Sequence, residues 1–520
     1  MGKWPCPSWT PAASRGNALP RLRLHESCGG RKAGAGPISE ADMIGDATER
    51  RRRARAALDR QDFAAARAEL EPLVAAEPGN PEGHGLLGAV RAAAGDHAGA
   101  AAAYATALRL RPGHGPTAHR LGAILLRLNA AERARAVLAP AAAAAVADGA
   151  LQATYAAALL RTERCQQAAD AATRATAHDP GLASAWITLA IARRRMGDLA
   201  GALTAADEAI RQAPRSAPAH LARAAALLGL GRFAEGWAEQ EWQWPPAPGT
   251  EPGPRAGWWD GRPVAGRIAI RGDQDPGEQL WASAFLPGLV RAGHRLVLEC
   301  APPLLALFRR SFPDIEVVAG ARPGDRVAAG IAAETPLSRL PAIAWQRHRR
   351  VGRPGERLIA DPVLKSRLRI HYRQAAAGRR IVGLARHGRS PDGQPPDGRS
   401  PAGQSRAGQS PETPLGRWGR LLDHPALFVV ELPEAVTDFD ALAAQVAAMD
   451  GVVAVPGPAA ATALAVGTPL VVAVDRFHPD WRYPIAGEDS PWQPGARLLR
   501  QKADDGWDAL LERIVRIAAE

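Results

Sequence analysis

The stretch Pro81–His114 reads PEGHGLLGAVRAAAGDHAGAAAAYATALRLRPGH, and its pattern recurs along the chain at a spacing of 34 residues. Leu87 and Gly88 lie midway along a first helical pattern, and Ala100 and Tyr104 lie on a second. Prolines recur on the same lattice, at Pro78, Pro112, Pro180 and Pro214. Each proline closes one unit of helix, turn and helix, because proline cannot continue a helix.

The equivalent positions of later units carry residues of similar size. These residues are Leu121, Gly122, Ala134, Leu138, Ala141, Leu189, Ala190, Ala202, Ala206 and Ala209. Small residues let two helices cross closely, and the larger ones fill the space between neighbouring units. The repeat therefore predicts a helical solenoid over about 47–242.

The spacing and the small and large residues at these positions resemble the tetratricopeptide-repeat family over five to six units. The resemblance implies a groove that holds a protein or peptide partner. Arg127, Arg161 and Arg195 share one position of the repeat. They form either a basic strip for an acidic partner segment or cations that favour the ends of their helices.

Composition divides the rest of the chain. We expect residues 1–42 to be a disordered or wrongly assigned N-terminal extension, because they lack periodicity, and residues 43–242 to form the solenoid. Residues 243–265 are a Pro/Gly-rich linker, and 266–375 and 376–520 are two halves of an α/β domain. The insert 388–412 is rich in Gly, Ser, Pro and Gln and cannot bury a core. We expect the chain to fold without 1–42 and 388–412.

Short apolar runs alternate with helical patterns after the linker. The expected strands are Arg267–Ile270, Leu296–Cys300, Glu316–Val318, Ile381–Leu384, Leu427–Val430, Val452–Val455 and Leu470–Val474. The expected helices are at about 278–292, 302–311, 438–449, 459–466 and 506–518. Near-continuous apolar strands between helices predict parallel sheets covered on both faces, in two doubly wound halves.

Three strings carry a second resemblance. They are GRFAEGWAEQEWQW at 231–244, the opening that begins WWDGRPVAGRIAIRGDQDPGEQLWASAFLPG at 258, and PDWRYPIAGEDSPWQPGARLLRQ at 479–501. In this order they resemble bacterial tetratricopeptide proteins with a C-terminal domain similar to family nine of the glycosyltransferases, which includes the heptosyltransferases. The resemblance implies a GT-B architecture of two Rossmann-like halves with a nucleotide-sugar donor between them.

The resemblance also implies site residues. The family's Gly-x-Gly-Asp turn, whose Asp acts as general base, maps onto 275–278, so Gly277 is a donor-site candidate and Glu278 replaces the Asp. The carboxylate of a Glu stands about 1.5 Å further out, which changes the geometry of proton transfer. Glu278 is either this base or an ordinary first-turn acid at a helix N-terminus.

The family's Asp-Thr-Ser-x-x-His motif, which binds the donor diphosphate, maps onto PGPAAA at 456–461. Backbone amides beside Gly457 remain as a phosphate site, but Pro458 removes one donor. Arg386 and His387, in the loop after an expected strand, are further candidates for a phosphate; an ordinary loop histidine is the alternative for His387.

The composition of the chain limits the classes of partner and cofactor that we expect. The net charge is +12, but the Arg residues are spread along the chain without aromatic interleaving, so we expect no nucleic-acid partner. No stretch is long and apolar enough to predict a membrane span. The four cysteines lack metal or redox spacing, and no metal and no cofactor are expected. The expected compartment is reducing and cytoplasmic.

The sequence favours one function and leaves a second as the alternative. The first is a scaffold whose solenoid binds a partner and whose glycosyltransferase-like domain has lost its catalytic residues. The second is an active, metal-independent inverting glycosyltransferase that uses Glu278 and a nucleotide sugar, with the repeats recruiting the acceptor. A basic nucleic-acid-binding repeat protein is a distant third.

Overall fold

The computed structural model describes residues 40–244, 258–320, 330–348, 357–386, 418–501 and 507–520. Short gaps within these ranges fall at 274, 434–435, 476–479, 484–486, 490–491 and 493–494. His387 and the insert 388–412 lie outside the described residues. The residues up to Pro78 and those from Gly79 onward form two compact units, which are described separately.

The first unit is a helix pair, α1 (Glu40–Asp59) and α2 (Phe63–Ala76). The helical backbone of α1 already begins inside the segment 1–42 that was expected to lack structure. Asp62 caps α2 by accepting a hydrogen bond from the backbone N–H of Ala65. Ala66, Leu70 and Leu73 are buried.

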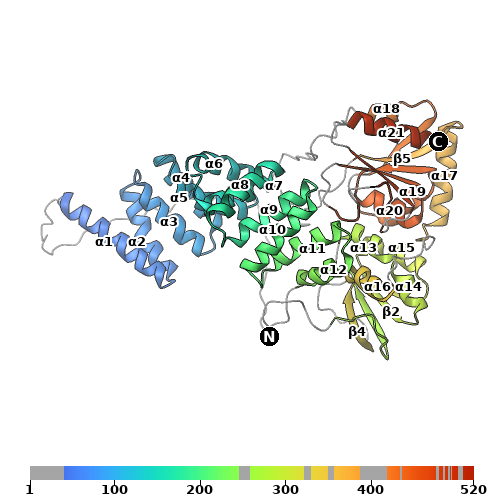
Figure 1. The fold of residues 1–520 in the computed structure, drawn as a ribbon, viewed down its shortest axis with the longest axis horizontal. Coiled ribbons are helices and arrows are strands. Elements are labelled where there is room, and N and C mark those ends of the chain that lie inside the picture. The colour runs from blue at the N-terminus through green and yellow to red at the C-terminus, as the bar shows by residue number, and fades with distance from the viewer. Residues whose placement is uncertain are drawn as a thin grey trace, which may run out of the picture. The chain divides into compact units, whose positions relative to one another are not determined.

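The second unit begins with ten more helices in pairs (Figure 1). They are α3 (Pro81–Ala93), α4 (His97–Leu110), α5 (Gly115–Arg127), α6 (Ala131–Ala144), α7 (Gly149–Arg161), α8 (Cys165–His178), α9 (Ala183–Arg195), α10 (Leu199–Gln212), α11 (Ala217–Gly229) and α12 (Phe233–Gln240). The short 3₁₀ helix η1 (Glu241–Gln243) follows. Pro78, Pro112, Pro180 and Pro214 all lie in turns, as predicted.

The repeat positions that the sequence singled out are buried in every unit. A Cβ on Gly88 would come within 2.8 Å of the ring of Tyr104, and one on Gly122 within 2.5 Å of Leu138. The glycines are therefore required by close helix crossing.

The turn inside each helix pair has one residue with left-handed backbone. These residues are Gln61, Gly95, Asn129, Glu163, Gly197 and Gly231, with φ between 56° and 85°. They follow one another at the 34-residue spacing, and three of the six are not glycine, although side chains disfavour this conformation.

The region after the solenoid contains two parallel sheets. Sheet A has the order β3-β2-β1-β4, and sheet B the order β6-β5-β7-β8-β9, with all pairs parallel. The strands of sheet A are β1 (Arg267–Arg271), β2 (Arg295–Cys300), β3 (Glu316–Ala319) and β4 (Ile331–Pro336). The strands of sheet B are β5 (Arg380–Ala385), β6 (Leu427–Glu431), β7 (Gly451–Ala454), β8 (Leu470–Val474) and β9 (Ala496–Arg500).

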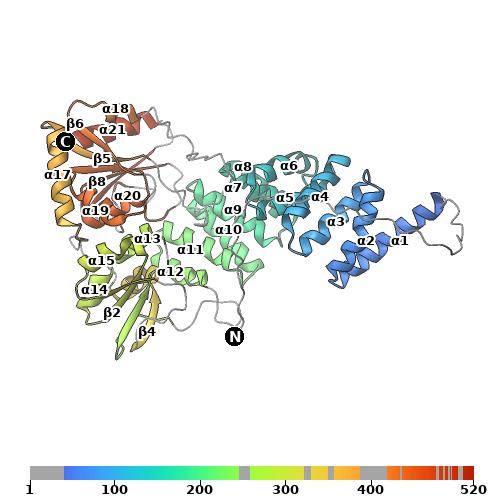
Figure 2. The same cartoon turned by 180° about the vertical axis from the view of Figure 1, so that it is seen from behind.

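Helices connect the strands and cover the sheets (Figures 1 and 2). They are α13 (Pro276–Ser283), α14 (Leu286–Arg291), η2 (Pro302–Leu304), α15 (Leu305–Ser311), η3 (Leu337–Arg339), α16 (Leu340–His348), α17 (Pro362–Ala376), α18 (Gly419–Leu422), α19 (Phe439–Ala447), α20 (Pro458–Val466) and α21 (Trp507–Ala519). Sheet B has a separate hydrophobic core on each face, which confirms the prediction of parallel strands covered on both sides.

The structure differs from the expected elements at one helix and two strands, and it contains the helices α16, α17 and α18, which were not predicted. The single helix expected at 278–292 is two helices, because Pro287 lies in the first turn of α14 and cannot donate to a continuing helix. Strands β4 and β9 were not predicted. Both are edge strands with polar residues, so their apolar runs are short.

Candidate functional site

The arginine ladder of the solenoid bonds one repeat to the next. Arg161 donates to the carbonyl oxygen of Leu126 at 2.8 Å, and Arg195 donates to that of Leu160 at 3.3 Å. Each acceptor lies at the C-terminal end of the equivalent helix in the preceding repeat. Each arginine thus adds a second donor to a carbonyl that already accepts a backbone hydrogen bond from the turn, from Asn129 in the case of Leu126 and from Glu163 in the case of Leu160. Arg127, in α5, is exposed.

An aromatic cluster joins the solenoid to both parts of the α/β region. Its members are Phe233, Trp237, Trp281, Phe285, Trp345, Trp481 and Trp492. The rings of Phe233 and Trp492 are 4.8 Å apart, and those of Trp237 and Trp481 are 5.1 Å apart. The three strings that the sequence marked out by resemblance, which lie far apart along the chain, thus meet in one hydrophobic core.

Arg482 is the charged centre of this junction. Its guanidinium binds both oxygens of Glu278, at 2.5 and 2.6 Å, and also binds Asp480 at 2.5 Å. It lies over the ring of Trp281, 5.0 Å from its centroid. Burial alone would lower the pKa of Arg482, but Asp480 and Glu278 raise it well above its ordinary value. The cation is therefore permanent, and it fixes both oxygens of Glu278 in place.

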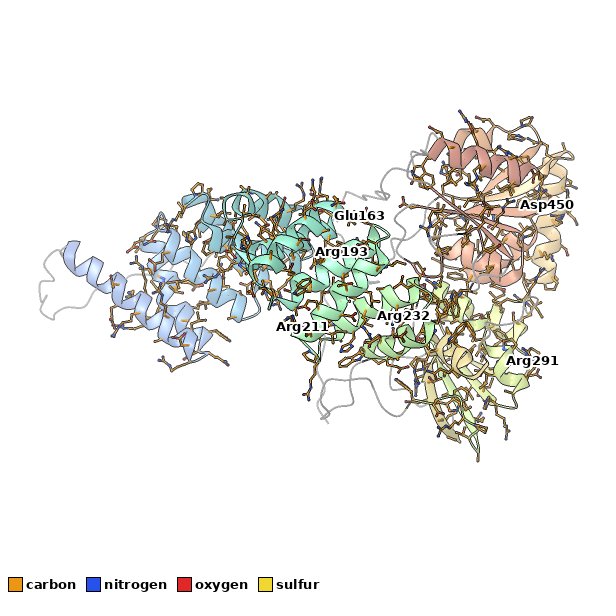
Figure 3. All side chains as sticks on the ribbon, viewed as in Figure 1. Glu163, Arg193, Arg211, Arg232, Arg291 and Asp450 are labelled. Atoms are coloured by element: carbon orange, nitrogen blue, oxygen red, sulfur yellow. The ribbon has the colours of Figure 1, made fainter. Side chains whose placement is uncertain are left out.

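Helix α9 of the solenoid interacts electrostatically with Asp480 of the same junction. Burial and the neighbouring Arg195 lower the pKa of Arg194 to about 10, and Asp480 opposes that shift. Burial raises the pKa of Glu163, because it disfavours the charged carboxylate, and Asp475, which follows β8, raises it further. Figure 3 shows Glu163 and Arg193 on the last repeats before the junction. The closing segment and the solenoid therefore share one electrostatic environment.

Two predicted glycines lie close together at the first turns of α13 and α20. A Cβ on Gly277 would lie 3.8 Å from the Cα of Pro458, the residue that follows Gly457. The side chains of Ala459 and Ala460 are buried, and Thr462 donates its hydroxyl to the carbonyl oxygen of Pro458. The N-terminus of α20 thus packs against α13 through small apolar groups.

Arg386 follows β5 at the edge of sheet B where the strand order reverses. This edge lies beside the predicted phosphate loop, because the N–H of Val455 donates to the carbonyl oxygen of Ala385. Carboxyl ends of strands at such a reversal are where doubly wound sheets bind ligands. The Arg386 guanidinium is 2.6 Å from the Glu431 carboxylate. Arg386 and Gly457 thus come to one edge.

A second arginine of the junction was not found from the sequence. Arg339 donates to Glu241 at 2.7 Å and to the carbonyl oxygen of Trp259 at 3.0 Å, and it lies over the ring of Trp244. Burial raises the pKa of Glu241, and Arg339 opposes the shift. The Trp-rich string 231–244 was a signal for this contact, since its aromatic and acidic residues supply the partners.

Metal-ligand clusters and membrane-spanning helices are both absent from the described ranges. Within them, no group of three or more His, Cys, Asp or Glu side chains is arranged to hold a metal ion. No helix there combines the length and the hydropathy that a bilayer crossing requires.

Two segments of the N-terminal helices match a known repeat family. Residues 51–114 and 187–239 match the tetratricopeptide-repeat family, and the N-terminal part of the chain is a helical solenoid of such repeats. The chain is similar to protein FlbA of Caulobacter vibrioides, with 30% identity over 280 residues. That match covers 45% of this chain and 46% of FlbA, so it spans about half the length of this relative.

Several solved structures are similar to part of this chain. MamA from Desulfovibrio magneticus RS-1 is 24% identical, with 34% of this chain and 97% of MamA covered and a TM-score of 0.31. PilW, a type IV pilus biogenesis factor, is 18% identical, with coverage of 38% and 91% and a TM-score of 0.34. YrrB, a tetratricopeptide protein with an unusual peptide-binding site, is 20% identical, with coverage of 32% and 86% and a TM-score of 0.30.

Proposed function

We propose that this protein is a scaffold in which a tetratricopeptide solenoid binds a protein or peptide partner and a GT-B-like domain no longer transfers sugars. The single observation that carries the proposal is the ion pair in which Arg482 binds Glu278. A general base needs an accessible lone pair directed at the acceptor hydroxyl. Both carboxylate oxygens of Glu278 instead accept hydrogen bonds from Arg482.

The GT-B assignment is part of the proposal. Two parallel sheets, each with one reversal of strand order, are what two Rossmann-like halves require. In this proposal the halves 266–375 and 376–520 contain the strands of sheet A and of sheet B respectively.

We propose that the site beside Gly457 no longer binds the diphosphate of a nucleotide-sugar donor. A diphosphate site in this architecture depends on side-chain donors and free backbone amides at the N-terminus of a helix. Here the first turn of α20 has a proline followed by buried alanines, and Gly277 of α13 lies against it. Arg386 is already paired with Glu431. Each lost hydrogen bond weakens binding by roughly 0.5–3 kcal/mol.

Calorimetric titration of the full chain with UDP-, GDP- and ADP-linked sugars tests this proposal. We expect no saturable binding below about 1 mM, because losing two or three such bonds takes a micromolar site into the millimolar range. Affinity capture of a partner should be the same for the parent and for Glu278→Gln. A micromolar dissociation constant for any of these donors would overturn the proposal.

The second candidate is an active inverting glycosyltransferase. It is favoured by the position of Glu278 in the first turn of α13, next to Gly277, which lies against Pro458 of α20. In this case Arg482 would release Glu278 when the acceptor binds. Turnover of a nucleotide sugar that disappears in Glu278→Gln and persists in Asp440→Asn would establish it; Asp440 pairs with Arg310 and provides a matched acidic control.

A further inference from the structure

A short strap, residues 358–361, precedes α17 and lies outside the helices and strands. It is nevertheless bonded to α15, a helix that packs in the core of sheet A. Ile359 donates its backbone N–H to Oγ of Ser311 at 2.9 Å, and its carbonyl oxygen accepts a hydrogen bond from Nε of Arg310 at 2.7 Å. Both polar backbone groups of Ile359 are thus held by α15.

The strap is also bonded to α20, a helix that packs in the core of sheet B. The backbone N–H of Leu358 donates to the carbonyl oxygen of Ala465 in α20 at 2.8 Å. Leu358 itself is buried in the core of sheet A. Two adjacent residues of the strap therefore tie together helices that cover different sheets.

Helix α15 also contacts the sheet B half directly, through α19. The guanidinium of Arg310 pairs with the carboxylate of Asp440, and the side chains retain only 25% and 21% of their exposure. A pair that is partly withdrawn from water is screened less than one on the open surface. Beside it, Phe439 and Ala443 of α19 are buried in the same core as Ile268 of β1. The two halves therefore share apolar packing as well as polar bonds.

These contacts are the opposite of a hinge. Two domains that close around a ligand part again through a few connecting residues whose backbone is free to change conformation. Here the connecting strap is bonded on both sides. Parting the halves would break the bonds of Leu358 or of Ile359, separate Arg310 from Asp440 and expose Phe439 to water, and each of these changes costs free energy.

We propose that the strap and the pair of Arg310 with Asp440 form a clamp, an autoinhibitory contact that keeps the two halves closed. A ligand that needs the halves to part cannot enter between them while the clamp holds. The inference rests on the proposed GT-B assignment where it names a nucleotide sugar as that ligand. The clamp gives a reason for the loss of sugar transfer that is separate from the residues beside Gly457.

Hydrogen–deuterium exchange of the full chain, read by mass spectrometry on peptides that cover the strap, tests the clamp. The strap has no helix or strand to protect its amides, so slow exchange at Leu358 and Ile359 reports their bonds to Ala465 and Ser311. We expect exchange at least about 100-fold slower than in the unfolded chain. In Arg310→Met combined with Ser311→Ala, which releases the strap from α15, it should become about tenfold faster or more.

The neighbouring Arg309 provides the matched control. It donates to the carbonyl oxygen of Val317 at 3.1 Å, within the sheet A half, so Arg309→Met removes a similar bond without touching the strap. Exchange in the strap should then remain as in the parent. Arg310→Lys keeps the charge but loses the planar fork, and it should accelerate exchange in the same direction by a smaller factor. Peptides of β1 and β5 should stay slow in every variant, which distinguishes release of the strap from unfolding.

Titration of the same proteins with UDP-, GDP- and ADP-linked sugars separates the clamp from the proposed function. Faster strap exchange in the clamp variant, with no donor bound by parent or variant, supports both. Micromolar binding of a donor by the clamp variant alone would confirm the clamp and overturn the loss of the donor site. The clamp is overturned if the strap of the parent exchanges as fast as the unfolded chain, if the clamp variant and Arg309→Met exchange alike, or if the parent binds a donor as tightly as the clamp variant does.

Discussion

At the scale of single residues, the close packing of the solenoid helices depends on glycines at defined positions. Gly88 and Gly122 leave room for Tyr104 and Leu138, and this role could be predicted because the 34-residue lattice aligned them with small residues in other repeats. The role of Arg161 could not be predicted. Its acceptor is a backbone carbonyl of the preceding repeat, which no side-chain pattern records.

A matched pair of glycines in α3 tests the packing argument. Gly88→Leu should lower the free energy of unfolding by about 1–3 kcal/mol, because its Cβ alone would collide with the buried ring of Tyr104. Gly85→Leu in the same helix meets nothing within 4 Å. It should leave stability unchanged or raise it by up to about 1 kcal/mol through helix propensity. Urea denaturation measures both, and equal losses would contradict the argument.

The ladder arginines give a second test. Arg161→Met should lower the free energy of unfolding by about 0.5–1.5 kcal/mol, because it removes a hydrogen bond to Leu126. Arg127→Met is the control, since within the described residues Arg127 makes no such bond to the preceding repeat. If the ladder instead binds an acidic partner, partner affinity would fall for both variants while stability stays unchanged.

At the scale of helices and strands, the sequence predicted seven of the nine described strands and missed one edge strand of each sheet. All seven expected strands are present within one or two residues of their predicted limits. In the missed β4 and β9, polar residues interrupt the apolar run, Glu334 and Thr335 in β4 and Arg497 and Arg500 in β9. Helix α17 was also missed, although Asp361 caps it and Pro362 occupies its first turn, both start signals that sequence inspection can use.

Asp450 holds α17 to sheet B and makes this contact depend on pH. Burial raises the pKa of Asp450, but hydrogen bonds from the Ile381 N–H and from Arg369 outweigh it, and the net pKa is lowered. A carboxyl with a lowered folded pKa stabilises the fold above the unfolded pKa, and this stabilisation is lost as the pH falls through the folded value.

Asp450→Asn should therefore cost about 1–3 kcal/mol at pH 7, where the carboxylate is charged. The difference between the variant and the parent should shrink as the pH falls below about 4. Denaturation curves at a series of pH values measure it. A difference that is constant from pH 7 to pH 3 would show that the charge of Asp450 is not what holds the helix.

At the scale of the whole molecule, the candidate site is also the structural junction. The resemblance indicated which strings belong to the domain, but not that Glu278 would meet Arg482, because these residues are 204 positions apart. Long-range pairs of this kind depend on how the sheets, the closing segment and the last repeat pack together. The sequence therefore placed Gly277, Glu278 and Gly457 near one another only through the resemblance.

Arg482→Met tests the importance of the junction. It would leave Glu278 and Asp480 without their shared cation, and the expected loss is about 3–5 kcal/mol in the free energy of unfolding. Arg420→Met provides the comparison, because its pair with Glu512 is exposed and should contribute about 0–1 kcal/mol. Similar small losses for both variants in thermal denaturation would show that the junction is not held by its buried charges.

The left-handed residue inside each helix pair has a consequence for how the protein can change in length. Because Gln61, Gly95, Asn129, Glu163, Gly197 and Gly231 keep the spacing of 34, the turn inside every helix pair has the same left-handed residue at the same position. Removing residues 115–148 would join His114 to Gly149 and return each later residue to an equivalent position. The repeat number is thus a variable that duplication or deletion of one module can adjust, and the distance spanned by the solenoid can change while its junction with the α/β region stays as it is.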